Sequence, residues 1–162
     1  MRINLKPGSP FSEAGTNIYL RRKTYPSIFT PLLGPGSNSR FSLEEDHYVA
    51  SGNWEGLEYT CTLRLSGRSQ SWQWLVEIKN TTGEKAELDL VYLQDIALKP
   101  SNSGLVNEYY VSQYLERRIL EDPRFGAVVC CRQNMKEPAG HPWLMMACGN
   151  GQLHNGIIRL TK

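Results

Sequence analysis

Long apolar runs are absent from this chain of 162 residues. A membrane-spanning helix needs about 20 consecutive apolar residues, and no stretch of that length occurs. The start of the chain also lacks the uninterrupted apolar centre of a signal peptide, because it is broken by Arg2, Lys6, Pro7, Pro10 and Glu13. The sequence therefore predicts a soluble chain with no targeting segment and no membrane partner.

An excess of one charge is missing as well. Lys and Arg total 18 against 16 for Asp and Glu, which gives a formal net charge of +2. Because the two signs nearly cancel, the chain produces no broad electrostatic field that would attract polyanions. The chain also has no Gly-rich phosphate loop and no dinucleotide fingerprint. We therefore expect no nucleic-acid partner and no cofactor.

Metal-binding spacings do not occur either. The four cysteines form no C-x-x-C pair, and the three histidines have no i, i+4 partner. The sequence thus predicts no metal site, and it predicts thiols that pack as small hydrophobic groups. Free thiols indicate a reducing compartment, so we expect a cytoplasmic protein. The residues concerned are Cys61, Cys130, Cys131, Cys148, His47, His141 and His154.

Alternation at period two is the strongest pattern that is present. Apolar and polar residues alternate from Leu57 to Leu65 and again from Trp72 to Ile78. Turn-forming residues, Ser66 to Ser69, separate the two segments. The pattern predicts an antiparallel hairpin whose apolar set faces the core.

Further strands are expected along the chain. Residues 86–98 are apolar on both faces, which is typical of a central strand, whereas residues 111–120 are compatible with helix or strand. Loop formers dominate the first 40 residues, so strands there must be short. Strands are also predicted at residues 17–22, 127–132 and 143–148. Without a long amphipathic helix, these segments predict one all-β domain over residues 1–162, an antiparallel β-sandwich.

Two polar-aromatic segments are candidates for binding. Tyrosine and tryptophan offer flat apolar faces, and amide, guanidinium and imidazole groups offer directional hydrogen bonds. A sugar ring presents an apolar face and a belt of hydroxyls, so this mixture suits carbohydrate. The predicted carbohydrate-binding residues are Tyr109, Gln113, Arg132, Gln133, His141 and Trp143. A packed, tyrosine-rich strand explains the first segment equally well. No catalytic residue is predicted.

The same segments resemble a known family. Residues 91–98, 107–114, 129–134 and 142–144 resemble the N-terminal domain of 1,2-β-oligoglucan phosphorylases, which belong with the cellobiose phosphorylase-like enzymes of glycoside hydrolase family 94. The resemblance implies a sandwich that is part of a galactose-mutarotase-like supersandwich. In that family the catalytic Asp and the phosphate site lie in a separate (α/α)6 barrel, so Asp95 is not the counterpart of the catalytic Asp.

Function and partners follow from the resemblance as expectations. The chain is expected to be a non-catalytic, carbohydrate-associated N-terminal domain, truncated from a β-glucan phosphorylase. Its expected partners are the (α/α)6 catalytic domain, a weakly bound β-glucan oligosaccharide and a second copy in a homodimer.

Two alternatives stay open. A free-standing carbohydrate-binding module is favoured if several of the tryptophans are exposed on one face; these are Trp54, Trp72, Trp74 and Trp143. A mutarotase-like sugar epimerase needs a His and a carboxylate at one site, and His141 with Glu108 is the pair to test.

Overall fold

The computed structural model describes residues 7–9, 12–15, 17–34, 36–94, 96, 98, 113–136, 140–149, 152–154 and 157–159. The described chain divides into two compact units, an N-terminal unit that ends at Leu93 and a C-terminal unit that begins at Gln94. This division does not test the prediction of one β-sandwich domain over residues 1–162.

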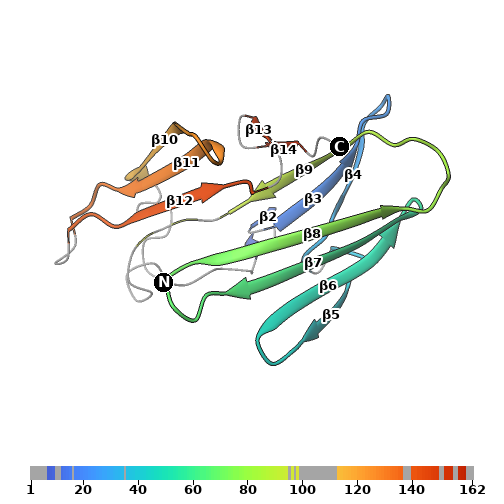
Figure 1. The fold of residues 1–162 in the computed structure, drawn as a ribbon, viewed down its shortest axis with the longest axis horizontal. Coiled ribbons are helices and arrows are strands. Elements are labelled where there is room, and N and C mark those ends of the chain that lie inside the picture. The colour runs from blue at the N-terminus through green and yellow to red at the C-terminus, as the bar shows by residue number, and fades with distance from the viewer. Residues whose placement is uncertain are drawn as a thin grey trace. The chain divides into compact units, whose positions relative to one another are not determined.

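The N-terminal unit consists of antiparallel strands (Figure 1). One sheet has the order β5-β6-β7-β8, and a second layer has β3 between β9 and β4. β1 and β2 form a separate two-stranded ribbon. The strands are β1 (Pro7–Ser9), β2 (Ser12–Gly15), β3 (Asn17–Arg22), β4 (Ile28–Pro31), β5 (Arg40–Leu43), β6 (His47–Trp54), β7 (Leu57–Leu65), β8 (Trp72–Asn80) and β9 (Leu88–Leu93).

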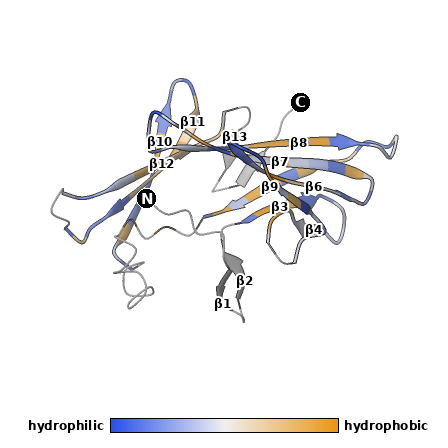
Figure 2. Cartoon of the chain, turned by 90° about the horizontal axis from the view of Figure 1, so that it is seen from below, coloured by the Kyte–Doolittle hydropathy of each residue, from blue (hydrophilic) through white to orange (hydrophobic). Residues whose placement is uncertain are grey.

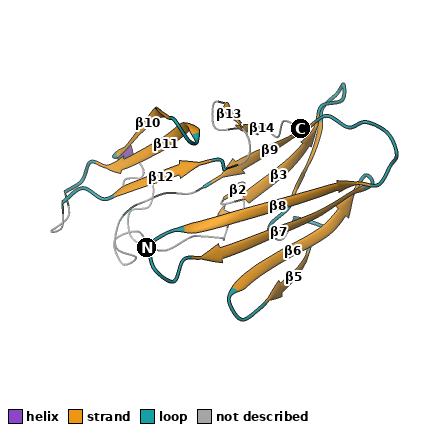
Figure 3. Ribbon diagram, in the orientation of Figure 1, coloured by secondary structure: helices purple, strands orange, loops and turns teal. Residues whose placement is uncertain are grey.

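The C-terminal unit contains a three-stranded antiparallel sheet, β10-β11-β12, and a small hairpin, β13-β14. Residues 111–120, for which helix and strand were both open, form a strand from Leu115 onward, and Gln113 is helical (Figure 3). The strands are β10 (Leu115–Asp122), β11 (Gly126–Gln133), β12 (Trp143–Ala147), β13 (Gln152–His154) and β14 (Ile157–Arg159). The all-β, antiparallel sandwich prediction is confirmed.

The core of the N-terminal unit follows from side-chain alternation. Leu57, Tyr59 and Cys61 on β7 lie on one face of their sheet and are buried. Ile18 and Leu20 on β3 are buried in the other layer. Figure 2 shows β8 as apolar along much of its length and hydrophilic at its end. The predicted β7–β8 hairpin is thus confirmed, with Leu65 paired to Trp72.

Polar contacts join the two layers at their margins. The Trp72 indole N–H donates to the Tyr92 hydroxyl at 3.4 Å, linking β8 to β9. The Ser39 hydroxyl donates to the carbonyl of Leu32 at 2.7 Å and lies 2.9 Å from the Tyr59 hydroxyl. These bonds satisfy polar groups that burial would otherwise leave unpaired.

The turn between β6 and β7 was not predicted. Glu55 and Gly56 have φ values of 52° and 74°, which is the backbone of a two-residue type I′ hairpin turn. Glycine adopts this conformation readily, whereas a glutamate there is uncommon. A Cβ at Gly56 would also lie 2.4 Å from Cγ2 of Thr82. Because the Glu-Gly pair is a weak turn signal, the sequence did not reveal β6.

A buried carboxylate is neutralised on the opposite face of β3 and β9. Asp89, which is fully buried, pairs in register with Arg21 and forms a salt bridge with it. The Arg21 Nε–H donates to Asp89 at 3.1 Å, and the Lys23 ammonium lies 3.1 Å from its other oxygen. Burial by itself would raise the pKa of Asp89, but the hydrogen bonds and charges of Arg21 and Lys23 outweigh it and lower that pKa.

Two leucines of β7 differ in solvent exposure, and the consequence for stability can be tested. Leu57 is fully buried, whereas Leu65, on the same face, is 65% exposed. Leu57→Ala should lower the free energy of unfolding by about 2–5 kcal/mol, since it leaves a cavity. Leu65→Ala should cost less than about 1 kcal/mol. Urea denaturation of both variants measures this, and equal losses would contradict the assigned packing.

The Asp89 cluster should depend on pH. A carboxylate whose pKa is lowered by folding stabilises the fold above its ordinary pKa, and this contribution is lost as the pH falls. Asp89→Asn should therefore cost about 1–3 kcal/mol near neutral pH. The difference from wild type should shrink below about pH 4. Urea titrations at both pH values test this, and a difference that does not change with pH would refute it.

Candidate functional site

The predicted site residues that the structure describes gather where β11 leads into β12. Arg132 and Gln133 end β11, Trp143 begins β12, and His141 precedes it. Gln113 is exposed just before β10. Tyr109 lies outside the described residues, so its predicted place in the site is not described.

Arg132 and Trp143 form the exposed part of this cluster. They are directly opposite in the β11–β12 register, and the guanidinium carbon lies 5.6 Å from the centre of the indole ring. Arg132 Nε donates to Asn134 Oδ1 at 3.0 Å and lies 3.8 Å from a carboxylate oxygen of Glu116. A cation held over the indole in this way stiffens a surface that combines an apolar ring with positive charge.

Gln133 faces away from that surface. It is fully buried, and its side-chain oxygen accepts from the backbone N–H of Met135 at 3.0 Å. The backbone of Gln133 accepts from Nδ1 of His141 at 3.0 Å. A carbonyl can only accept, so His141 carries a proton on Nδ1. Gln133 thus organises the loop between the strands and does not present its amide to a ligand.

The groups of this cluster do not form an acid–base pair. Arg132 stays charged at any ordinary pH. His141 holds a backbone carbonyl, and Glu108, its proposed partner in an epimerase, lies outside the described residues. What the described geometry can supply is a stacking face and hydrogen-bond donors.

The exposed-tryptophan condition for a carbohydrate-binding module is not met. Trp54, Trp72 and Trp74 are half-buried, and they lie on the sheet face that packs into the core. Trp143 is the exposed one, at 56%. A single exposed ring does not make the aromatic platform that this alternative required.

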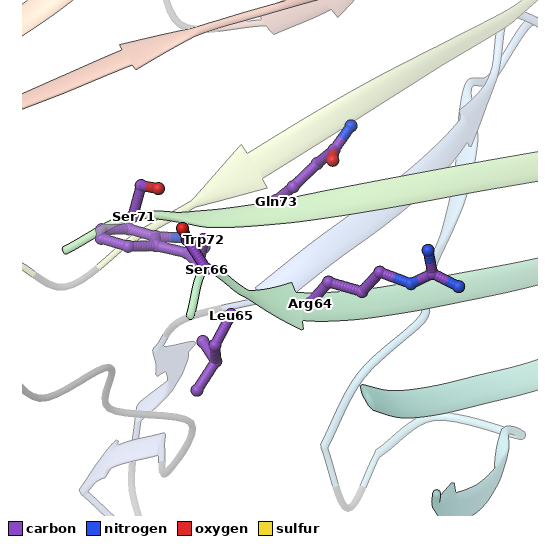
Figure 4. Close-up of a pocket in the computed structure, with 6 residues that line it drawn as sticks. All are labelled: Arg64, Leu65, Ser66, Ser71, Trp72 and Gln73. Carbon is purple, nitrogen blue, oxygen red and sulfur yellow. The ribbon is translucent and has the colours of Figure 1, made fainter. Parts of the chain in front are cut away.

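A depression of about 260 Å³ lies at the tip of the β7–β8 hairpin. Its lining includes Arg64, Gln73, Ser66, Ser71 and Trp72. Figure 4 shows the head groups of Arg64 and Gln73 pointing away from the two serines. The serine hydroxyls bond mainly within their own turn through Ser69, at 2.9 and 2.7 Å. The polar groups therefore do not converge on one ligand.

The exposed carboxylate of Asp46 forms a local pair. The Asp46 carboxylate lies 2.5 Å from Nδ1 of His47, and this hydrogen bond holds the pKa of Asp46 below its usual range. Among the residues the structure describes, no group of three or more His, Cys, Asp or Glu side chains could hold a metal ion. The described chain also has no helix that is long and apolar enough to cross a membrane.

Sequence reasoning missed two sets of exposed apolar residues. One is on the β5-β6-β7-β8 sheet, at Phe41, Leu43 and Leu65, and the other is on the edge strand β12, at Met145. The available signal was a short apolar segment with no charged residue, in residues 143–147. Such a segment indicates a strand edge that is open to pairing with another chain, provided that the strand lies at the edge of its sheet.

Thiol reactivity should follow burial. Burial raises the pKa of Cys61 to about 12, and burial likewise raises the pKa of Cys131, despite the opposing charge of Arg117. Cys130 is also buried, and Cys148 is half-buried. With a disulfide reagent near pH 8, native protein should therefore release about one thiol equivalent quickly, from Cys148. Denatured protein should release four, and a Cys148→Ser variant should lose the fast phase. Rapid reaction of all four in the native state would contradict the burial.

Comparison with known proteins gives one family. A family model described as the SOGP N-terminal domain matches residues 1–154. No curated protein matches the chain. This match corrects the identification made by resemblance: the family shown is the SOGP N-terminal domain, and no relative supports membership of glycoside hydrolase family 94.

The functional expectations that rested on the resemblance are corrected with it. The prediction of a carbohydrate-associated domain of a β-glucan phosphorylase is wrong, because the matching family is a different one. The same holds for the predicted phosphorylase, glycosyltransferase and carbohydrate-binding roles. No contact among the described residues is evidence of carbohydrate binding. The two alternative sugar functions are not carried forward either. The β-sandwich remains. Because the match covers nearly all of its length, the chain belongs to the SOGP N-terminal domain family.

Proposed function

We propose that this chain is a non-catalytic N-terminal domain that packs against a second folded domain of the same protein. The surface that would make this contact is the open apolar end of the β5-β6-β7-β8 sheet, formed by Phe41, Leu43, Tyr48 and Leu65. The family description, an N-terminal domain, supports a role beside further domains. Asp89 is paired with Arg21, and Asp46 is hydrogen-bonded to its neighbour His47, and these local contacts support the absence of catalysis.

The observation that carries the proposal is the exposure of a face that elsewhere forms the core. By register, Phe41 and Leu43 lie on the same side of the sheet as Ala50 and Leu63, both of which are buried. Leu43 is nevertheless 84% exposed and Phe41 46% exposed. Apolar side chains grouped on an uncovered sheet face mark a contact surface.

The exposed residues lie at the edge of their sheet. The Trp72–Tyr92 bond places β8 against β9, and the edge strand at the other side of the β5-β6-β7-β8 sheet is β5. Phe41 and Tyr48 stack there, with ring centres 5.9 Å apart. The rings thus form a preformed apolar platform.

Charges beside the platform indicate the character of its partner. The turn between β5 and β6 carries Glu44, Glu45 and Asp46, all of them exposed. An apolar centre with a charged rim is the usual anatomy of a protein interface. The partner domain should therefore present an apolar patch with basic residues beside it.

The test uses the polypeptide encoded directly downstream of this domain, expressed separately, and measures its binding by calorimetry. Leu43→Glu and Leu65→Glu should each weaken binding at least about tenfold, because each places a charge in the apolar contact. Leu75→Glu is the matched control, since Leu75 is 48% exposed on the other face of the same sheet.

Two outcomes would overturn the proposal. One is a gene that ends with this domain, which leaves no domain for it to contact. The other is binding that Leu43→Glu and Leu65→Glu do not weaken relative to Leu75→Glu. Urea denaturation of each variant checks that the fold is intact, and exposed substitutions of this kind should change stability by less than about 1 kcal/mol.

A further inference from the structure

The edge of β12 is a second unpartnered surface, and it lies in the other unit. In the described part of the C-terminal unit, β12 pairs with β11 on one side, and its other side is the margin of the sheet. Trp143 and Met145 are 56% and 66% exposed, and Ala147 is exposed. Inference from this edge does not depend on the proposed function, which concerns the N-terminal unit.

The backbone groups that point outward from β12 can be identified. The N–H of Gln133 donates to the carbonyl of Pro142 at 3.1 Å, and these residues are opposite each other in the continued β11–β12 register. In an antiparallel ladder, hydrogen-bonded and non-hydrogen-bonded pairs alternate. Leu144 and Met146 therefore direct their N–H and C=O groups toward β11. Trp143, Met145 and Ala147 direct theirs to the open edge.

This edge lacks the features by which proteins block strand addition. Charged residues and proline within an edge strand prevent pairing with another chain. The edge strand β8 carries Glu77 and Lys79, and β10 carries five charged residues. β12, with the sequence WLMMA, contains neither a charge nor a proline. Its edge can therefore accept a further strand.

We propose that two copies of this chain associate through β12, which pairs antiparallel with β12 of the second copy about a two-fold axis at Met145. In this register Trp143 lies opposite Ala147 of the second copy, and Met145 lies opposite itself. Each such pair uses outward-directed backbone groups and exchanges two hydrogen bonds. Registers shifted by two residues pair fewer of these groups, so this one makes the most bonds.

Side-chain size favours a second copy as the occupant. Directly opposite residues on one face of an antiparallel pair contact each other. The register sets the large Trp143 beside the small Ala147, twice, and sets two flexible methionine side chains beside each other at the axis. No like charges are opposed, because the strand has none. The two three-stranded sheets then form one continuous sheet.

Sedimentation velocity over about 1–300 µM should show a monomer–dimer equilibrium for the wild type. Met145→Pro removes an outward N–H and no bond to β11, so it should raise the dissociation constant at least about tenfold while the fold persists. Met145→Lys should do the same without altering the backbone. The matched control, Leu75→Lys on edge strand β8, should leave the dimer unchanged.

A size exchange tests the register itself. Ala147→Trp places two large side chains opposite each other and should weaken the dimer, whereas Trp143→Ala combined with Ala147→Trp restores a large–small pair and should recover it. A wild type that stays monomeric over the whole range overturns the proposal, even if β12 binds another protein. A dimer that neither Met145 variant weakens also overturns it, with thermal denaturation confirming that each variant is folded.

Discussion

The covering of one face of the β5-β6-β7-β8 sheet is the constraint on which the N-terminal unit depends. Strict alternation along β7 puts Leu57, Tyr59 and Cys61 on one side, where they must leave water. The layer formed by β9, β3 and β4 provides that cover. The cover does not extend to the edge strand β5, where Phe41 and Leu43 stay in solvent. The surface proposed for docking is therefore the remainder of the same face that builds the core.

Charge burial shows a second consequence of layer packing. Asp89 is the second residue of β9, where strand register sets Arg21 opposite it, and Lys23 reaches its second oxygen. A buried carboxylate without these cations would be strongly unfavourable. Both cations come from β3 or the residue directly after it, so the ion cluster also ties the pairing of β3 with β9 to a single register.

In the C-terminal unit, register determines both the candidate site and the open edge. The alternation that sets Arg132 beside Trp143 on one face also directs the backbone of Trp143, Met145 and Ala147 outward. Gln133, one residue further, faces the other side and is buried. Residues that are neighbours in sequence thus have opposite roles, one at the surface and one in the packing of the loop.

The local features of this protein could be predicted from its sequence. Alternation predicted the β7–β8 hairpin, because a half-buried strand needs that period. Strands at residues 17–22 and 127–132 were also predicted from the sequence and are present. Tertiary structure alone decided which parts of each face are covered: Leu57 and Leu65 follow the same pattern, yet one is buried and the other exposed. It also decided that Gln133 is interior, that Arg21 lies opposite Asp89, and that β12 is an edge. These properties depend on contacts between segments distant in the chain, which periodicity within one segment does not contain.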